Sequence, residues 1–250
     1  MKKTVLVLLL CVLAACNNEK KEKDPVGGND VVIKKDAILT SDILTAEQQQ
    51  KLTPKEILDR LQKGNQDFIA DRLTVRNNTE RVRQASLGQF PKAVILSCLD
   101  SRVPVEDVFH SGLGNLFVAR VAGNIVNEDI LGSLEFGTRV SGAKVIVVLG
   151  HEYCGAIKSA IDGVELGNIT ALLNKIKPPL ATAKANFKGE TTSSNPAFIE
   201  AVCDENVFYA IQQIRTKSPI LADMEKKGEL LIVGAVYDMK TGKVEYLKEK

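Results

Sequence analysis

Three residues with metal-binding side chains follow two apolar segments of the chain. Cys98 comes at the end of the first segment, and His151 and Cys154 come after the second. Two thiolates and one imidazole form a ligand set that suits zinc. Three protein ligands leave the fourth tetrahedral position for water or for Asp100. An open zinc site of this kind is catalytic in type, because the metal lowers the pKa of its bound water.

The two apolar segments, residues 93–97 and 144–150, consist mainly of β-branched and aliphatic residues. Segments of this length and composition predict buried β-strands. In open α/β sheets, sites are built at the carboxyl edge of the strands. Cys98 lies far before His151 in the chain, so the fold must bring the two strand ends together. We therefore expect the two strands to be parallel neighbours.

Asp100 and Arg102 follow the first predicted strand closely. A bidentate arginine–carboxylate pair would keep Asp100 ionised and oriented. Two thiolates reduce the net positive charge at the metal, so the metal lowers the pKa of its bound water less. A neighbouring group is therefore expected to help activate that water. Asp100 could accept a hydrogen bond from a zinc-bound hydroxide, or it could itself bind the metal and close the site.

The sequence Cys98-Leu99-Asp100-Ser101-Arg102, followed by His151-x-x-Cys154, resembles the zinc signature of β-class carbonic anhydrases. The resemblance extends from about residue 52 to about residue 247. It implies reversible hydration of carbon dioxide to bicarbonate and a proton, with zinc-bound hydroxide as the nucleophile. In that family, the aspartate that Asp100 matches pairs with arginine in the open form, whereas in the inactive closed form it binds zinc.

Further residues match the plant-like branch of this family by their offsets. Gln89 matches a glutamine that donates a hydrogen bond near the substrate, and Phe117 matches an aromatic wall of the pocket. Phe136 stands where that branch commonly has tyrosine, so one hydroxyl is missing; for both phenylalanines, core packing is the alternative. Gly155 would offer a backbone N–H beside the zinc. Because the family's site is shared between subunits, the resemblance also implies a homodimer or homotetramer, with Gln89 and Phe117 contributed across the interface.

Two other functions fit the same residues. The site could hydrolyse a molecule similar to carbon dioxide, such as carbonyl sulfide or carbon disulfide, with the same nucleophile. The chain could also be a non-catalytic zinc-binding protein with a permanently closed site. The pair of Asp100 and Arg102 argues against this last function, since a structural site needs no arginine to hold the aspartate off the metal.

The first 15 residues have the pattern of a secretory signal peptide, with two lysines before an apolar stretch that is too short to span a bilayer. Residues 13–16, Leu-Ala-Ala-Cys, resemble a bacterial lipobox, with Cys16 as the lipidated first residue of the mature chain; the alternative is an ordinary signal peptide. Residues 16–45 are then a lipidated, flexible tether, and residues 46–250 are a single catalytic α/β zinc domain. We expect a lipid anchor at the bacterial cell envelope, on the periplasmic side.

The remaining patterns predict helices that alternate with strands. Thr53 to Glu56 form a capping box, and Asn195-Pro196 predicts the start of a long helix. Other helices are expected at 128–140 and from Gly155, other strands at 116–121, 230–237 and near the C-terminus, and a break at prolines 178 and 179. This alternation is typical of an α/β fold with a mainly parallel sheet flanked by helices. The resemblance implies that the N-terminal helices pack on a neighbouring subunit.

The composition excludes several classes of partner. The 250 residues carry a formal net charge of only +2 and have no long basic block, so nothing supports nucleic-acid binding. The chain has no tryptophan, which argues against a base-stacking platform. Its cysteines do not form the pattern of a disulfide-rich domain, and Cys203 is expected in the core. His110 is expected to be a surface or capping residue rather than a proton shuttle.

Overall fold

The computed structural model describes residues 43–72 and 78–248. The predicted signal peptide, Cys16 and most of the predicted tether lie outside these residues. Within the described ranges, no helix combines the length and the apolar character needed to cross a membrane.

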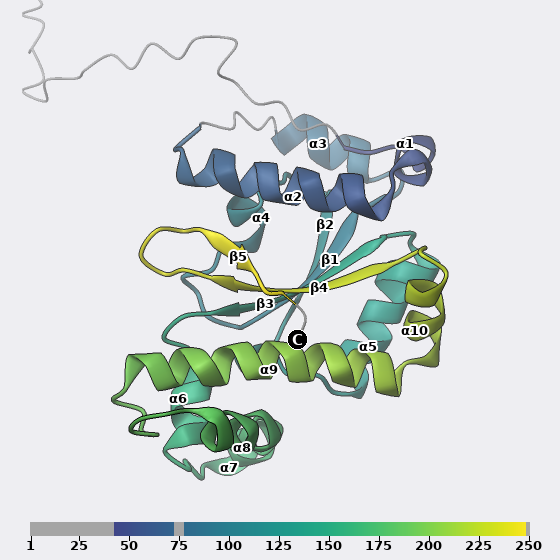
Figure 1. Ribbon diagram of the computed structural model, residues 1–250. Helices are drawn as coiled ribbons and strands as arrows, with labels where there is room; N and C mark the ends of the chain where they lie inside the picture. Colours follow the sequence, from purple (N-terminus) through teal and green to yellow (C-terminus); the bar gives the residue numbers. More distant parts are fainter. Residues whose placement is uncertain (1–42, 73–77, 249–250) are drawn as a thin grey trace, which may run out of the picture. The chain divides into compact units, whose positions relative to one another are not determined.

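A five-stranded sheet forms the centre of the described part (Figure 1). Its strands are β1 (Ala93–Ser97), β2 (Leu116–Arg120), β3 (Val145–His151), β4 (Leu231–Tyr237) and β5 (Val244–Tyr246), in the order β2-β1-β3-β4-β5. Strands β1 to β4 pair in parallel, and β5 pairs antiparallel to β4. This topology confirms the predicted, mainly parallel sheet. It also makes β1 and β3 neighbours, as the candidate ligands require.

Helices connect the strands and cover both faces of the sheet (Figure 1). They are α1 (Ala46–Lys51), α2 (Pro54–Ile69), α3 (Asn78–Ala85), α4 (Val105–Val108), α5 (Glu128–Glu135), α6 (Gly155–Ile161), α7 (Gly167–Leu173), α8 (Lys177–Asn186), α9 (Pro196–Lys217) and α10 (Pro219–Lys226). Two short helical segments, η2 (Ala122–Asn124) and η3 (Phe136–Val140), complete the connections.

Local sequence explains where several helices begin. Helix α2 starts with the predicted capping box at Thr53, and α9 starts at Pro196 with Asn195 as its N-cap. The break expected at prolines 178 and 179 falls instead at residues 174–176, between α7 and α8, and the prolines lie within the first turn of α8. Proline is tolerated there because the first-turn N–H groups have no partner within the helix. The helix predicted at 128–140 divides into α5 and the π-helical η3.

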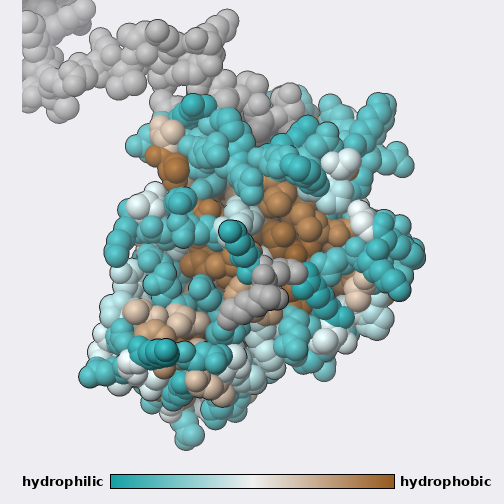
Figure 2. All heavy atoms as spheres, in the orientation of Figure 1, coloured by the Kyte–Doolittle hydropathy of each residue, from teal (hydrophilic) through white to brown (hydrophobic). Residues whose placement is uncertain are grey.

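Alternate residues of the central strands supply two separate apolar layers. Val94 and Leu96 pack in the layer that contains buried residues of α5, α9 and α10, whereas Ala93 and Ile95 pack in the layer under α2 and α4. Every residue of β1 and β3 is buried, as expected for a parallel sheet covered on both faces. In Figure 2, apolar side chains gather between α2 and α9, while the outer surface of α2 is largely hydrophilic.

A third apolar cluster lies beneath the carboxyl edge of the sheet. It contains residues of α6, α8 and α9 together with Cys98 and Cys154. Cys203, on α9, is 2% exposed, which confirms the prediction that it is a core residue. The candidate metal ligands therefore rest on a packed apolar layer rather than on a free loop.

Candidate metal centre

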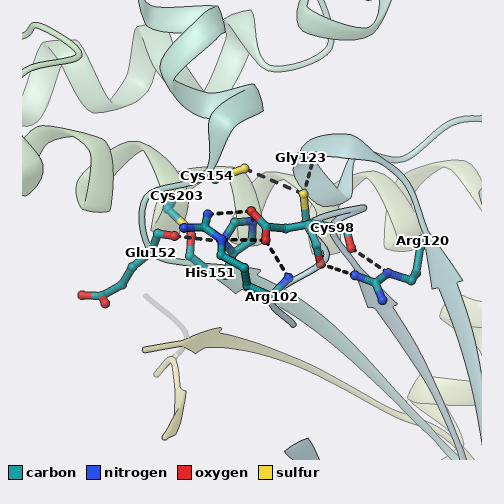
Figure 3. A network of polar contacts seen from close by, with 9 residues as sticks. Cys98, Arg102, Arg120, Gly123, His151, Glu152, Cys154 and Cys203 are labelled. Atoms are coloured by element: carbon teal, nitrogen blue, oxygen red, sulfur yellow. Dashed lines mark hydrogen bonds and ion pairs between the residues drawn. The ribbon is translucent and has the colours of Figure 1, made fainter. Parts of the chain in front are cut away.

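The three candidate ligands meet at the carboxyl edge of the sheet (Figure 3). Cys98 follows β1, His151 is the last residue of β3, and Cys154 is the N-cap of α6. All three are buried, and their ligand atoms lie within 4.8 Å of one another. The two sulfur atoms are 3.9 Å apart. The side chains of a residue just after β1, the last residue of β3 and the N-cap of α6 thus surround one point.

Strand register explains why residues so distant in sequence converge. Ser97 pairs with Leu149, so β1 and β3 reach the same edge of the sheet. His151 still pairs with Tyr237 of β4, so it belongs to the strand itself and not to the loop after it. Gly150 lets α9 approach closely, because a Cβ there would lie 2.9 Å from the sulfur of Cys203.

The imidazole of His151 is oriented by its own loop. Its Nδ1 lies 2.8 Å from the carbonyl oxygen of Glu152, and since a carbonyl only accepts, Nδ1 carries the proton. The Nε2 atom is left as the ligand atom. It is buried, and it has no hydrogen-bond partner among the described residues. A buried acceptor without a partner is rare in proteins, and a metal ion at this position would satisfy it.

The electrostatics of the two thiols also favour a cation. The hydrogen bond from Cys154 lowers the pKa of the Cys98 thiol, against the effect of burial, and the N–H of Gly123 at 3.3 Å contributes. The same contact with Cys98 and its burial raise the pKa of Cys154. A divalent cation between the sulfurs would favour the thiolate form of both. The donor set therefore fits zinc.

Asp100 and Arg102 form a bidentate pair beside the ligands. Arg102 donates from Nε to one carboxylate oxygen at 2.9 Å and from its terminal nitrogen to the other at 2.7 Å. These bonds hold the pKa of Asp100 well below its usual range. One oxygen of Asp100 lies 3.8 Å from Nε2 of His151. An ionised, oriented acceptor thus stands next to the position that a metal would occupy.

Residues that the sequence analysis missed also hold this loop. Arg120, at the end of β2, donates from Nε to the carbonyl oxygen of Cys98 at 2.9 Å and from its terminal nitrogen to that of Asp100 (Figure 3). The thiol of Cys203 donates to the carbonyl oxygen of His151 at 3.5 Å. Arg120 is a charged residue near the carboxyl end of the strand predicted at 116–121, and this position is the sequence feature that could have indicated its role at the site.

The candidate pocket residues do not all reach the metal centre within one chain. Phe117 pairs with Val94, which lies three residues before the end of β1. At about 3.3 Å per residue, this position is roughly 10 Å from the carboxyl edge of the sheet. Phe117 and Phe136 line a groove of about 570 Å³. Gln89 is exposed and precedes β1, so it lies toward the opposite edge. Gly155 opens α6 directly after Cys154.

His110, the other histidine, follows α4 and is partly buried with a φ of 48°. It is not a member of the ligand group.

Comparison with known proteins identifies a family for most of this fold. Residues 93–244 match the sequence model of the family described as "Carbonic anhydrase". A carbonic anhydrase of Mycolicibacterium smegmatis is 29% identical over 191 residues, which cover 74% of this chain and 89% of that protein. One of Pseudomonas aeruginosa is 33% identical over 165 residues, 64% of this chain and 74% of that protein. A solved chain of the tetrameric β-carbonic anhydrases of the ascomycete Sordaria macrospora has the same fold, with a TM-score of 0.61, 22% identity, and coverage of 69% of this chain and 88% of its own.

Proposed function

The chain belongs to the carbonic anhydrase family, with the β-class fold, and on this premise we propose that it catalyses CO₂ + H₂O ⇌ HCO₃⁻ + H⁺. The observation that carries this function is the convergence of Cys98, His151 and Cys154 beside an aspartate that is already paired with arginine. Carbon dioxide and bicarbonate are then the substrate and the product.

The cofactor is zinc, and the two sulfurs and Nε2 of His151 would hold it. When bound, zinc lowers the pKa of a coordinated water toward neutrality and so supplies a nucleophile near neutral pH. The protein's part is to fix its donors. The bond from His151 to the Glu152 carbonyl sets the ring, and Gly123 N–H supports the Cys98 sulfur.

We assign Asp100 the task of orienting the attacking water. Its carboxylate accepts a hydrogen bond from that water and directs the oxygen lone pair toward carbon dioxide. Arg102 keeps both carboxylate oxygens engaged, and this supports an open site in which Asp100 is not a ligand. The proton released on hydration leaves to buffer. This arrangement agrees with the plant-like, open-site branch of the family.

Zinc content and carbon dioxide hydration, measured on the same preparation, test this function. We expect about one zinc per chain and hydration far above the uncatalysed rate. Cys154→Ala should lose both the metal and the activity, because it removes a ligand. Cys203→Ser is the matched control, since it replaces an equally buried thiol that lies outside the ligand group and keeps a donor for the carbonyl oxygen of His151. Full zinc occupancy in Cys154→Ala would contradict the ligand assignment.

We also propose that the protein works as a homodimer or a larger homo-oligomer, with Gln89 and Phe117 completing the site of a neighbouring subunit. Strand β2 pairs only with β1 among the described residues, so it is an edge of the sheet. Beside this edge, Phe136 lines a groove with Phe117 and Val118 of β2, and it is 52% exposed. Large exposed apolar side chains next to an unpaired strand are typical of a subunit interface.

The N-terminal pattern supports a location for this activity. We propose that the chain is exported and is then lipidated at Cys16, so that residues 17–45 tether the catalytic domain to the membrane. The enzyme would then exchange carbon dioxide and bicarbonate on the periplasmic side of the cell envelope.

A further inference from the structure

The sulfur of Cys98 accepts a hydrogen bond from the backbone N–H of Gly123, at 3.3 Å (Figure 3). Gly123 belongs to η2 and has a φ of 71°, a conformation that residues with a side chain rarely adopt. A Cβ at this position would also lie 2.8 Å from Cδ1 of Ile176. The donor to the sulfur is therefore a backbone group in a special conformation, and something must hold it there.

Asn206 supplies that support from α9. Its amide nitrogen donates to the carbonyl oxygen of Gly123 at 2.8 Å, and the residue is 2% exposed. Its neighbours on the same face of α9, Val202, Cys203, Val207 and Ala210, are buried and mainly apolar. A polar amide in such a row is costly unless it makes a specific hydrogen bond. The single polar position on this apolar face is also the sequence signal that could have revealed it.

We propose that Asn206 is a positioning residue of the metal centre. It holds the Gly123 backbone so that the N–H of this residue points at the sulfur of Cys98. A hydrogen bond to a metal-bound thiolate withdraws electron density from the sulfur, and it fixes where the sulfur lies. This inference rests on the zinc site proposed above, and it assigns to one buried amide the tuning of that site.

The alternative is a purely structural role, in which Asn206 only satisfies a buried carbonyl. The two roles predict different results. A structural role lowers the stability of the fold and leaves the metal's surroundings unchanged in the protein that does fold. A positioning role changes the metal–sulfur bond and the retention of the metal. Loss of outer-shell partners typically costs about 10- to 100-fold in metal affinity.

The test compares Asn206→Leu, which has a similar volume and no donor, with the wild type. Release of zinc to a chromogenic chelator should be about 10-fold faster in the variant. In the cobalt(II)-substituted protein, the sulfur-to-metal charge-transfer band should shift. If Asn206→Leu folds poorly, Asn206→Ala removes the same donor with less crowding.

Gln213→Leu is the matched control. Gln213 lies on the same helix and lines the same cavity of about 650 Å³ as Asn206, yet no hydrogen bond links it to Gly123. It should keep the wild-type release rate and spectrum.

A lower melting temperature in Asn206→Leu, with zinc release and the cobalt band both unchanged, would overturn the inference and leave the zinc site standing. A wild-type protein that binds no zinc would overturn the proposed function and this inference together.

Discussion

Replacing Arg102 with alanine removes the group that keeps Asp100 from the metal. In the structure, both carboxylate oxygens are held by the guanidinium, at 2.9 and 2.7 Å. One of these oxygens is already 3.8 Å from Nε2 of His151, so a small rotation would bring it to a zinc bound there. We expect Arg102→Ala to keep its zinc and to lose most of its activity, because the aspartate competes with water for the fourth position.

The size of this effect follows from the two lost hydrogen bonds. A hydrogen bond to a charged group contributes about 1.5–3 kcal/mol. The Arg102 side chain is 56% exposed, so solvent screening reduces the contribution of the pair below that range. We expect the balance between open and closed sites to shift by about 10-fold when the pair is lost. We therefore expect kcat/KM to fall by about 10-fold.

Stopped-flow hydration and metal analysis on the same sample check this prediction. Arg102→Lys is the control, since it keeps the positive charge but cannot form the two-pronged contact, and its activity should fall between the other two. An Arg102→Ala protein with full activity would refute the proposed orientation of Asp100. A variant that loses its zinc would show that Arg102 acts by holding the ligands instead.

Three other outcomes can be measured independently. Cys16→Ser should move the protein from the membrane fraction to a soluble extracytoplasmic fraction, and a wild type that is already soluble after gentle lysis would contradict lipidation. Light scattering of the wild type should show at least a dimer. Phe136→Asp should weaken this dimer, because it places a charge in the proposed interface. A fully active monomer would disprove the shared site. Burial and, to a smaller extent, the charges of Arg60 and Arg81 lower the pKa of Lys92 from 10.5 to about 8, so its charged form destabilises the fold at pH 7. Lys92→Met removes this charge and should stabilise the fold at pH 7 by up to about 3 kcal/mol. The unfolded chain binds the Lys92 proton more tightly than the folded chain does, so the stability of the wild type should rise between pH 8 and 10.5. Urea unfolding of both proteins should show that the greater stability of the variant disappears over the same pH range.

The ligand group was predictable from sequence because the fold leaves it little freedom. Cys98 and His151 each come at the end of a continuous apolar strand, and such strands share one edge when they are parallel neighbours. The capping box at Thr53 and the Asn195-Pro196 pair fixed the starts of α2 and α9 for equally local reasons.

The supporting residues were not predictable in the same way. Gly123 and Asn206 act through hydrogen bonds that depend on how α9 packs. The pattern of α9 marks Asn206 as a polar position on an apolar face, but it does not say which backbone group this side chain contacts. In the proposed oligomer, Gln89 and Phe117 would reach the metal centre of a second subunit, and the periodicity of a single chain does not describe such a contact. The sequence thus predicts the metal ligands better than it predicts the residues that position those ligands.

The complete burial of β1 and β3 has a consequence for how the enzyme acquires its metal. Both strands are stabilised by apolar layers on their two faces, so folding brings Cys98 and His151 together without help from an ion. Small zinc domains, in contrast, unfold when the metal is removed. This protein should therefore pass between stripped and loaded forms with unchanged circular dichroism, and zinc supply, rather than refolding, would set how quickly activity returns.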